Sequence, residues 1–254
     1  MENLSPNNES PEVFEPWAVP DFLVSFFREI DESLRYKTRF SIPTKQNEHI
    51  VQYINRRIAT GLGTIPAGKI FYRARIHEFG KKDLYKRKEM GAPPNGKAGS
   101  GRMNPEGISY LYLANSSNTA IAEIRPWKGA TLSVGKFKTQ KELRIVSLSK
   151  SIEITDPTDT KTTTKFVIDS ILHALYFSIP AHGEDKFSYL ASQYIAEQFK
   201  QRNVDGIEYP SVLNEEGTNT VLFDIDSAIC INVTGHAVEK ISYSSRRWNP
   251  PKKK

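Results

Sequence analysis

Four short segments of the chain carry the residue types from which an active site without a metal ion can be built. They supply arginine, tyrosine, glutamate and serine, and in chain order they read FYRAR at 71–75, GRMNP at 101–105 with YLYLA at 110–114, TAIAEIRP at 119–126, and DGIEYPS at 205–211. A planar guanidinium forks onto phosphate oxygens, and a carboxylate stabilises positive charge that develops beside it. These types therefore suit phosphate binding and charge stabilisation.

The chain lacks the sequence motifs of several other kinds of active site. The chain contains no G-x-x-x-x-G-K-[ST], G-x-G-x-x-G or H-E-x-x-H, which argues against a P-loop nucleotidase, a Rossmann dehydrogenase and a zincin. The five histidines show no metal-ligand spacing, so no metal site is predicted. Ser211 lies in no G-x-S-x-G elbow, and no histidine motif marks a base for it, so the sequence does not require it to be a nucleophile.

The elements that position these residues follow from hydrophobic periodicity. Apolar spacing predicts a helix that begins at Asp21 and another from Thr44 to just before Gly61. A strand near 70–76 places Arg73 and Arg75 on one face, and a short capped helix that ends before Pro126 carries Glu123. Further strands are expected at 109–113, 131–138, 143–149, 206–210, 219–223, 228–233 and 238–243, and further helices near 166–175 and 189–199.

This order of helices and strands, without strict βαβ alternation, predicts an α+β fold. We divide the chain into a mobile N-terminal tail at 1–20, a helical N-terminal extension at 21–66, a core domain at 67–243 and a basic C-terminal tail at 244–254. Within the core domain, residues 80–105 are rich in glycine, proline and basic residues, which predicts a long, positive, mobile loop.

Composition excludes some classes of protein. Cys230 is the one cysteine, so no internal disulfide forms, and with no leader peptide evident we expect a cytoplasmic protein. The apolar runs are far shorter than the roughly 20 residues of a spanning helix. The net charge of +6 is local: residues 246–254 hold five positive charges, and residues 1–245 carry a net charge of +1. Direct binding to nucleic acid is therefore not favoured.

The ordered segments resemble the RES domain family, which is named for an arginine, a glutamate and a serine. The resemblance places that arginine at Arg73 in FYR, the glutamate at Glu123 in AIAE and the serine at Ser211 in YPS. Arg102 in GRMNP, Tyr112 in YLA and Asn219 in NTVLF match further family segments, although Met103 replaces the aromatic residue common after the Gly-Arg pair.

The resemblance implies a fold similar to ADP-ribosyltransferases, with a mixed β core and flanking helices, and a bacterial toxin that consumes NAD+. It makes 67–243 the NAD+-binding catalytic domain and implies a cognate antitoxin that occludes the NAD+ cleft. Glu123, Arg73 and Ser211 are the implied catalytic residues. The implied contacts to NAD+ come from Arg73, Arg75, Tyr72, Arg102, Tyr112 and Asn219.

Physical chemistry is consistent with these roles. Cleavage of the nicotinamide–ribose bond leaves an oxocarbenium-like ribose, which Glu123 can stabilise. Arg73 and Arg102 can fork onto the pyrophosphate, Tyr112 can stack on the nicotinamide ring, and Ser211 can hydrogen-bond Glu123 or the ribose. The pattern mildly favours Arg73 over Arg75 for the pyrophosphate.

The sequence leaves alternatives open. Water as acceptor makes the protein an NAD+ glycohydrolase, and inorganic phosphate as co-substrate makes it a phosphorylase. A protein or nucleic-acid acceptor makes it a mono-ADP-ribosyltransferase. The rival from another class is a non-enzymatic protein that binds nucleic acid or a partner through the basic cluster at 81–88 and the C-terminal lysines.

Overall fold

The computed structural model describes residues 21–149, 169–170, 189–243, 245 and 247. The helical elements of this part of the chain are α1 (Asp21–Glu32), η2 (Ser33–Lys37), α2 (Thr44–Gly61), η3 (Arg87–Met90), α3 (Ser117–Glu123), α5 (Leu190–Lys200) and η5 (Ile225–Ser227). Its strands are β1 (Leu62–Ile65), β2 (Ile70–Ile76), β3 (Leu111–Ala114), β4 (Thr131–Thr139), β5 (Leu143–Ser147), β6 (Gly206–Pro210), β7 (Thr218–Leu222) and β8 (Ala228–Ala237).

The strands form one eight-stranded sheet in the order β1-β5-β6-β7-β3-β2-β4-β8. The β5–β6 pair is parallel, and the other described pairs are antiparallel. A parallel pair requires a crossover connection, and α5 lies in the chain between these two strands. The molecule is a mixed α+β structure, which confirms the predicted class.

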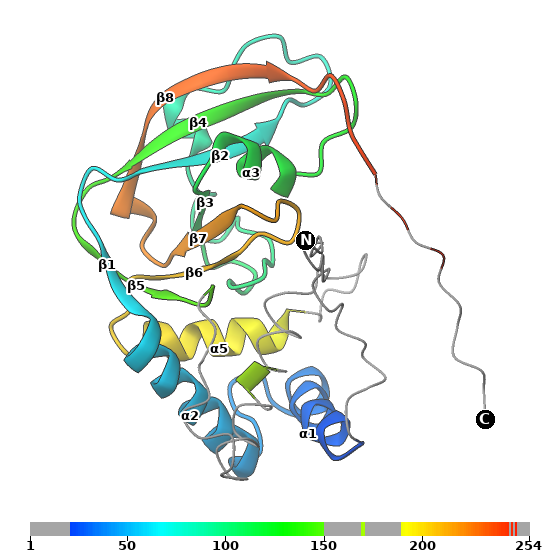
Figure 1. Ribbon diagram of the computed structural model, residues 1–254, viewed down its shortest axis with the longest axis vertical. Coiled ribbons are helices and arrows are strands. Elements are labelled where there is room, and N and C mark those ends of the chain that lie inside the picture. The colour runs from blue at the N-terminus through cyan, green and yellow to red at the C-terminus, as the bar shows by residue number, and fades with distance from the viewer. Residues whose placement is uncertain (1–20, 150–168, 171–188, 244, 246, 248–254) are drawn as a thin grey trace, which may run out of the picture.

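Two groups of α-helices cover different parts of the same face of this sheet. In Figure 1, α1, α2 and α5 gather beside β5 and β6, whereas the short α3 lies over β2 and β3. The larger core cluster joins the N-terminal helices to α5 through buried side chains such as Phe26, Ile30, Ile54 and Phe199. The amphipathic faces predicted for the N-terminal helices therefore pack within the chain, where burial of each large apolar side chain contributes roughly 1.5–3 kcal/mol.

The N-terminal extension is not entirely helical, because it also supplies an edge strand. Residues 62–65 form β1, which pairs antiparallel with β5 over four residues. In the sequence, Gly61 and Gly63 indicate the end of a helix, but they give no sign of the strand that follows. Gly61 is required here, since a Cβ atom on it would lie 2.6 Å from the backbone oxygen of Ser147 on β5.

The prediction of two separate strands, at 228–233 and 238–243, is wrong. One long strand, β8, runs from Ala228 to Ala237, and no strand covers 238–243. Gly235 does not interrupt this strand, because it pairs with Ser133 of β4. Leu84 lies against Gly235 in the space that a side chain there would occupy. The irregularity in the pairing with β4 lies instead between Lys136 and Phe137.

The segment at 80–105, predicted as a mobile loop, is anchored to the sheet. It has little regular structure apart from η3, but Tyr85, Met90, Ala98, Met103 and Asn104 are all buried. Its apolar side chains insert into the core clusters on both faces of the sheet. The glycine, proline and lysine content that predicted mobility belongs to the residues between these anchors.

Three predictions lie outside the described residues: the tails at 1–20 and at most of 244–254, and nearly all of the helix near 166–175. Among the described helices, none is both long and apolar enough to cross a membrane.

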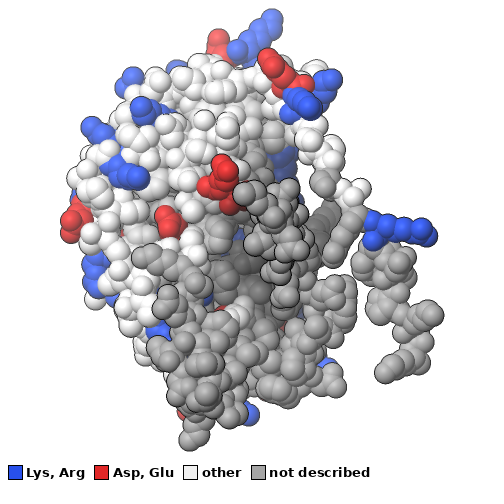
Figure 2. Space-filling model, viewed as in Figure 1, with Lys and Arg blue, Asp and Glu red and all other residues white. Residues whose placement is uncertain are grey.

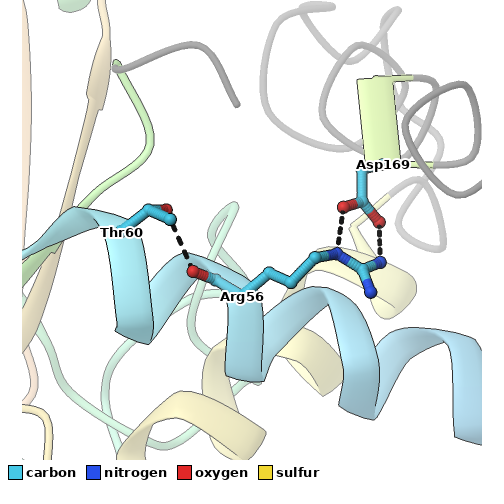
Figure 3. Close-up of polar contacts among 3 residues, drawn as sticks. All are labelled: Arg56, Thr60 and Asp169. Carbon is cyan, nitrogen blue, oxygen red and sulfur yellow. Dashed lines mark hydrogen bonds and ion pairs between the residues drawn. The ribbon is translucent and has the colours of Figure 1, made fainter. Parts of the chain in front are cut away.

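An ion pair links α2 to Asp169. Two guanidinium nitrogens of Arg56, Nε and Nη2, donate to the two carboxylate oxygens of Asp169 at 2.6 and 2.5 Å (Figure 3). The Asp169 side chain is only 2% exposed, whereas that of Arg56 is 30% exposed. The carboxylate is thus a buried charge that this fork neutralises.

We expect Arg56→Ala to lower the free energy of unfolding by about 2–3 kcal/mol, somewhat less than the roughly 3–5 kcal/mol typical of a fully buried pair, because Arg56 is partly exposed. Arg28→Ala is the matched control, since its pair with Glu32 is exposed on both sides and contributes under about 1 kcal/mol. Urea denaturation measures both. Equal losses in the two variants would contradict a special role for the Asp169 pair.

Candidate functional site

A cavity of about 280 Å³ lies between α3 and the middle of the sheet. Its walls come from five elements, β2, β3, α3, β6 and β7, which belong to three separate regions of the sequence. Five of the predicted site residues line it, namely Tyr72, Arg73, Tyr112, Glu123 and Asn219. The structure therefore gathers most of the predicted set at one place.

Glu123 lies at the end of α3 and is exposed to solvent, but its carboxylate is held in place. Oε1 accepts hydrogen bonds from Ser211 Oγ at 2.7 Å and from Asn219 Nδ2 at 2.6 Å. Both donors are buried, at 6% exposure each. Two buried polar groups that point at one exposed carboxylate are not typical of a surface glutamate, whose partner is usually water.

Ser211 acts as a donor to Glu123 because its own lone pairs are occupied. The backbone N–H groups of Leu213 and Asn214 donate to Ser211 Oγ at 3.2 and 3.1 Å. A hydroxyl has one proton and two acceptor positions, so its proton is left for the carboxylate. In this geometry the Ser211 hydroxyl donates its proton to the Glu123 carboxylate.

Local sequence explains where α3 begins and ends. The Ser116 side chain caps the helix by accepting from the Thr119 backbone N–H at 3.1 Å. Thr119 is fully buried, and its hydroxyl accepts from Asn214 Nδ2 at 2.8 Å, which ties the helix to the β6–β7 turn. Arg125, with φ of 46°, and Pro126 then end the helix just after Glu123.

The two arginines of β2 have different surroundings. Arg73 lines the cavity, and its Nη1 donates to the Tyr112 backbone oxygen at 3.1 Å. Burial, followed by the positive charge of Arg75, lowers the pKa of Arg73, while Tyr112 opposes that shift. Arg75 is exposed, stacks over the Tyr85 ring at 4.3 Å and donates to the Glu89 backbone oxygen. Only Arg73 of the pair therefore faces the cavity.

Tyr112 is fixed in the cavity wall by its hydroxyl. It donates to Asn104 Oδ1 at 2.8 Å and accepts from the Met103 backbone N–H at 2.9 Å. Burial is the main cause that raises the pKa of Tyr112 to about 12, so the phenol is neutral at pH 7. Two other tyrosines near these segments are engaged elsewhere: the Tyr85 ring lies under Arg75, and the Tyr110 hydroxyl donates to Glu197.

Arg102 is near this wall but does not line the cavity. Its guanidinium lies over the Tyr189 ring, 5.6 Å from the centroid, and its backbone oxygen accepts from Ser192 on α5. The segment around it is held by Gln193, whose Nε2 donates to the backbone oxygens of Gly101 and Asn104. The positive charge of Arg102 also lowers the pKa of Tyr112, a secondary effect that places it near the site.

Two residues of this site were not predicted individually from the sequence. Tyr209 on β6 lines the cavity beside Asn219, and burial raises its pKa. Asn104 supports Tyr112 and donates to three backbone oxygens, of Gly99, Pro105 and Ile108. Both lie inside segments that the sequence singled out, but nothing local distinguishes them from their neighbours.

Comparison with models of protein families agrees with the segment pattern. The model of the RES domain family matches residues 70–250, and the chain belongs to this family. A similar solved structure is the crystal structure of the M. tuberculosis MbcT–MbcA toxin–antitoxin complex. That match has 15% sequence identity and a TM-score of 0.39, and covers 75% of this chain and 93% of that chain. No curated protein matches the chain.

Gly101 has no room for a side chain, and this makes a test of the Asn104–Tyr112 support. A Cβ atom there would lie 2.3 Å from Asn104 Oδ1 and 3.0 Å from the Tyr112 hydroxyl. We expect Gly101→Ala to lower the free energy of unfolding by about 1–3 kcal/mol, as for other overpacked sites. Gly99→Ala is the control, because its Cβ would meet nothing within 4 Å. Chemical denaturation compares the two, and a Gly101→Ala variant as stable as Gly99→Ala would refute the packing argument.

Proposed function

We propose that this protein is the toxin of a toxin–antitoxin pair and that it consumes NAD+ by cleaving the nicotinamide–ribose bond. Membership of the RES family supports the class of protein. The observation that carries the chemistry is the Glu123 carboxylate, held by two buried donors at the mouth of a cavity that Arg73 also lines. An ADP-ribosyltransferase-like arrangement of the sheet is part of this proposal.

The proposed reaction breaks the bond between ribose C1′ and the nicotinamide nitrogen. The bonding electron pair leaves with nicotinamide, which becomes neutral, and positive charge moves to the ribose ring. The acceptor then forms a bond to C1′ and loses its proton to solvent. Glu123 lowers the barrier by stabilising the cationic ribose, and because Ser211 and Asn219 orient it beforehand, little reorganisation is needed during the reaction.

The binding residues divide the substrate among them. Arg73 offers a guanidinium to the pyrophosphate, and its bond to the Tyr112 backbone oxygen holds that guanidinium in the cavity wall. Tyr112 and Tyr72 offer aromatic faces to the nicotinamide. Ser211 and Asn219 serve the reaction through Glu123. Arg75 and Arg102 do not line the cavity, so we assign them no direct contact with the part of NAD+ bound there.

The acceptor is water, inorganic phosphate or a macromolecule, giving a glycohydrolase, a phosphorylase or a mono-ADP-ribosyltransferase. The partner we propose is an antitoxin protein that covers the cavity mouth and so keeps NAD+ out. The solvent exposure of Glu123 supports this, because the catalytic carboxylate lies within reach of a protein that docks on the surface.

Direct binding of nucleic acid has less support. On the face shown in Figure 2, lysine and arginine side chains of the described residues lie apart around the rim and alternate with acidic ones. A nucleic-acid site instead gathers positive charge into a patch or stripe.

The first prediction from this proposal concerns Glu123. We expect Glu123→Gln to lower kcat for NAD+ cleavage roughly 100-fold or more, because the amide cannot stabilise developing positive charge. Phosphorus NMR of NAD+ with wild type, with and without inorganic phosphate, identifies the product as ADP-ribose or ADP-ribose-1″-phosphate, and labelled NAD+ in a cell lysate reveals transfer to a macromolecule. Glu142→Gln, which changes an exposed carboxylate in the connection between β4 and β5, is the control. Unchanged turnover in Glu123→Gln would sink the assignment.

The second prediction separates the two arginines of β2. We expect Arg73→Ala to raise KM for NAD+ at least about tenfold, the loss expected for a hydrogen bond to a charged group. Arg75→Ala, whose guanidinium is stacked on Tyr85, should change KM less than about threefold, well below that loss. Initial-rate kinetics decide the matter, and a larger effect from Arg75 would reverse the two roles.

A further inference from the structure

A second cavity lies beside the first one on the same face of the sheet. Its volume is about 380 Å³, and Tyr72 lines both cavities. Its polar lining comes from Ser117, Lys136, Asn232, Thr234 and His236, and no described residue that lines it is acidic. None of these residues belongs to the predicted site.

The two cavities follow one row of residues across the sheet. In the strand register, Asn232 pairs with Lys136, Lys136 with Tyr72, Tyr72 with Ala114, Ala114 with Asn219, and Asn219 with Tyr209. Residues directly opposite each other on adjacent strands point to the same face. All six residues line one or the other cavity, so the cavities are two parts of a single groove that crosses six strands.

The first cavity is too small to hold a dinucleotide. At about 280 Å³ it falls below the roughly 300–1,000 Å³ of pockets that hold drug-sized ligands, and a dinucleotide is a large ligand. If Glu123 acts on the nicotinamide ribose, the other half of the molecule needs further space. The adjoining cavity beyond Tyr72 supplies it.

The charges along the groove differ from end to end. Glu123 lies at one end, where the nicotinamide ring of NAD+ carries its positive charge. Lys136 lies at the other end, is partly buried, and has no hydrogen bond or ion pair through its side chain with any described residue. An ammonium group in a cavity without a carboxylate is suited to a phosphate. Asn232, Thr234 and His236 add hydrogen-bonding groups, and Thr234 Oγ1 and His236 Nε2 lie 3.0 Å apart.

Resting on the proposed function, we propose that the second cavity binds the adenylate half of NAD+, with Lys136 on its phosphate. Lys136 is three strand spacings from Asn219, which is about 14 Å at the usual spacing of about 4.8 Å. This separation is too large for Lys136 to hold the acceptor that attacks C1′ beside Glu123. It suits the opposite end of an extended substrate, with Tyr72 between the two halves.

The test uses AMP as the probe and the full chain. Titration of AMP, followed by ligand-observed NMR, should show affinity weakened about tenfold or more in Lys136→Ala, and Lys136→Arg should retain most of it. Lys138→Ala is the matched control, since it removes the same charge two residues along β4 from an exposed position outside the cavity, and it should bind AMP as wild type does. In NAD+ cleavage, Lys136→Ala should raise KM by a similar factor and leave kcat within about twofold.

The outcomes separate this proposal from the proposed function. If wild type cleaves NAD+ but Lys136→Ala binds AMP and NAD+ normally, the second cavity is not the adenylate site and the function stands. If NAD+ stays intact while AMP binds in a Lys136-dependent way, the cavity assignment stands and the function falls. Absence of AMP binding by wild type, or an equal loss in Lys138→Ala, would overturn the cavity assignment.

Discussion

The tether between Glu123 and the buried pair Ser211 and Asn219 is the constraint on which the rest of the site depends. It joins the end of α3 to β7 and to the residue that follows β6, so one carboxylate spans three elements. A buried donor without an acceptor costs about 1–3 kcal/mol, and both donors here satisfy that need on the same oxygen. The same hydrogen bonds therefore hold α3 on the sheet and orient the Glu123 carboxylate. A second polar connection, from Asn214 to Thr119, holds the start of the same helix.

The order of strands explains how distant segments meet. β2, β3 and β7 are neighbours in the sheet although well over a hundred residues separate β2 from β7 in the chain. Antiparallel pairing aligns Tyr72, Ala114 and Asn219 in one row, and alternation directs them to the face that α3 covers. Loop 80–105 completes the wall from the side, because Asn104 fixes the Tyr112 hydroxyl and Gln193 of α5 fixes the backbone around Asn104.

Charge is arranged along this groove rather than over the whole surface. The carboxylate is at one end, Arg73 is in the middle region and Lys136 is beyond Tyr72. Such an arrangement complements a ligand that is cationic at one end and anionic farther along. It also accounts for how a chain whose first 245 residues have a net charge of only +1 can present strong local fields, because the field in a cleft depends on the nearest charges.

Local patterns in the sequence predict the element types and the segments that carry chemistry. Periodicity located α2, β2, α5 and the capped helix of Glu123, because those signals are local. It divided β8 wrongly and missed β1. A glycine in the sequence does not reveal whether it ends an element or instead makes room for a neighbouring residue, as Gly61 and Gly235 do. Alternation put Arg73 and Arg75 on one face, but the tertiary structure shows that Arg73 lines the cavity, whereas Arg75 stacks on Tyr85 of the loop that follows β2. Tyr209, Asn104 and Lys136 likewise acquire their places from strand register and loop packing, which are long-range contacts that no local pattern encodes.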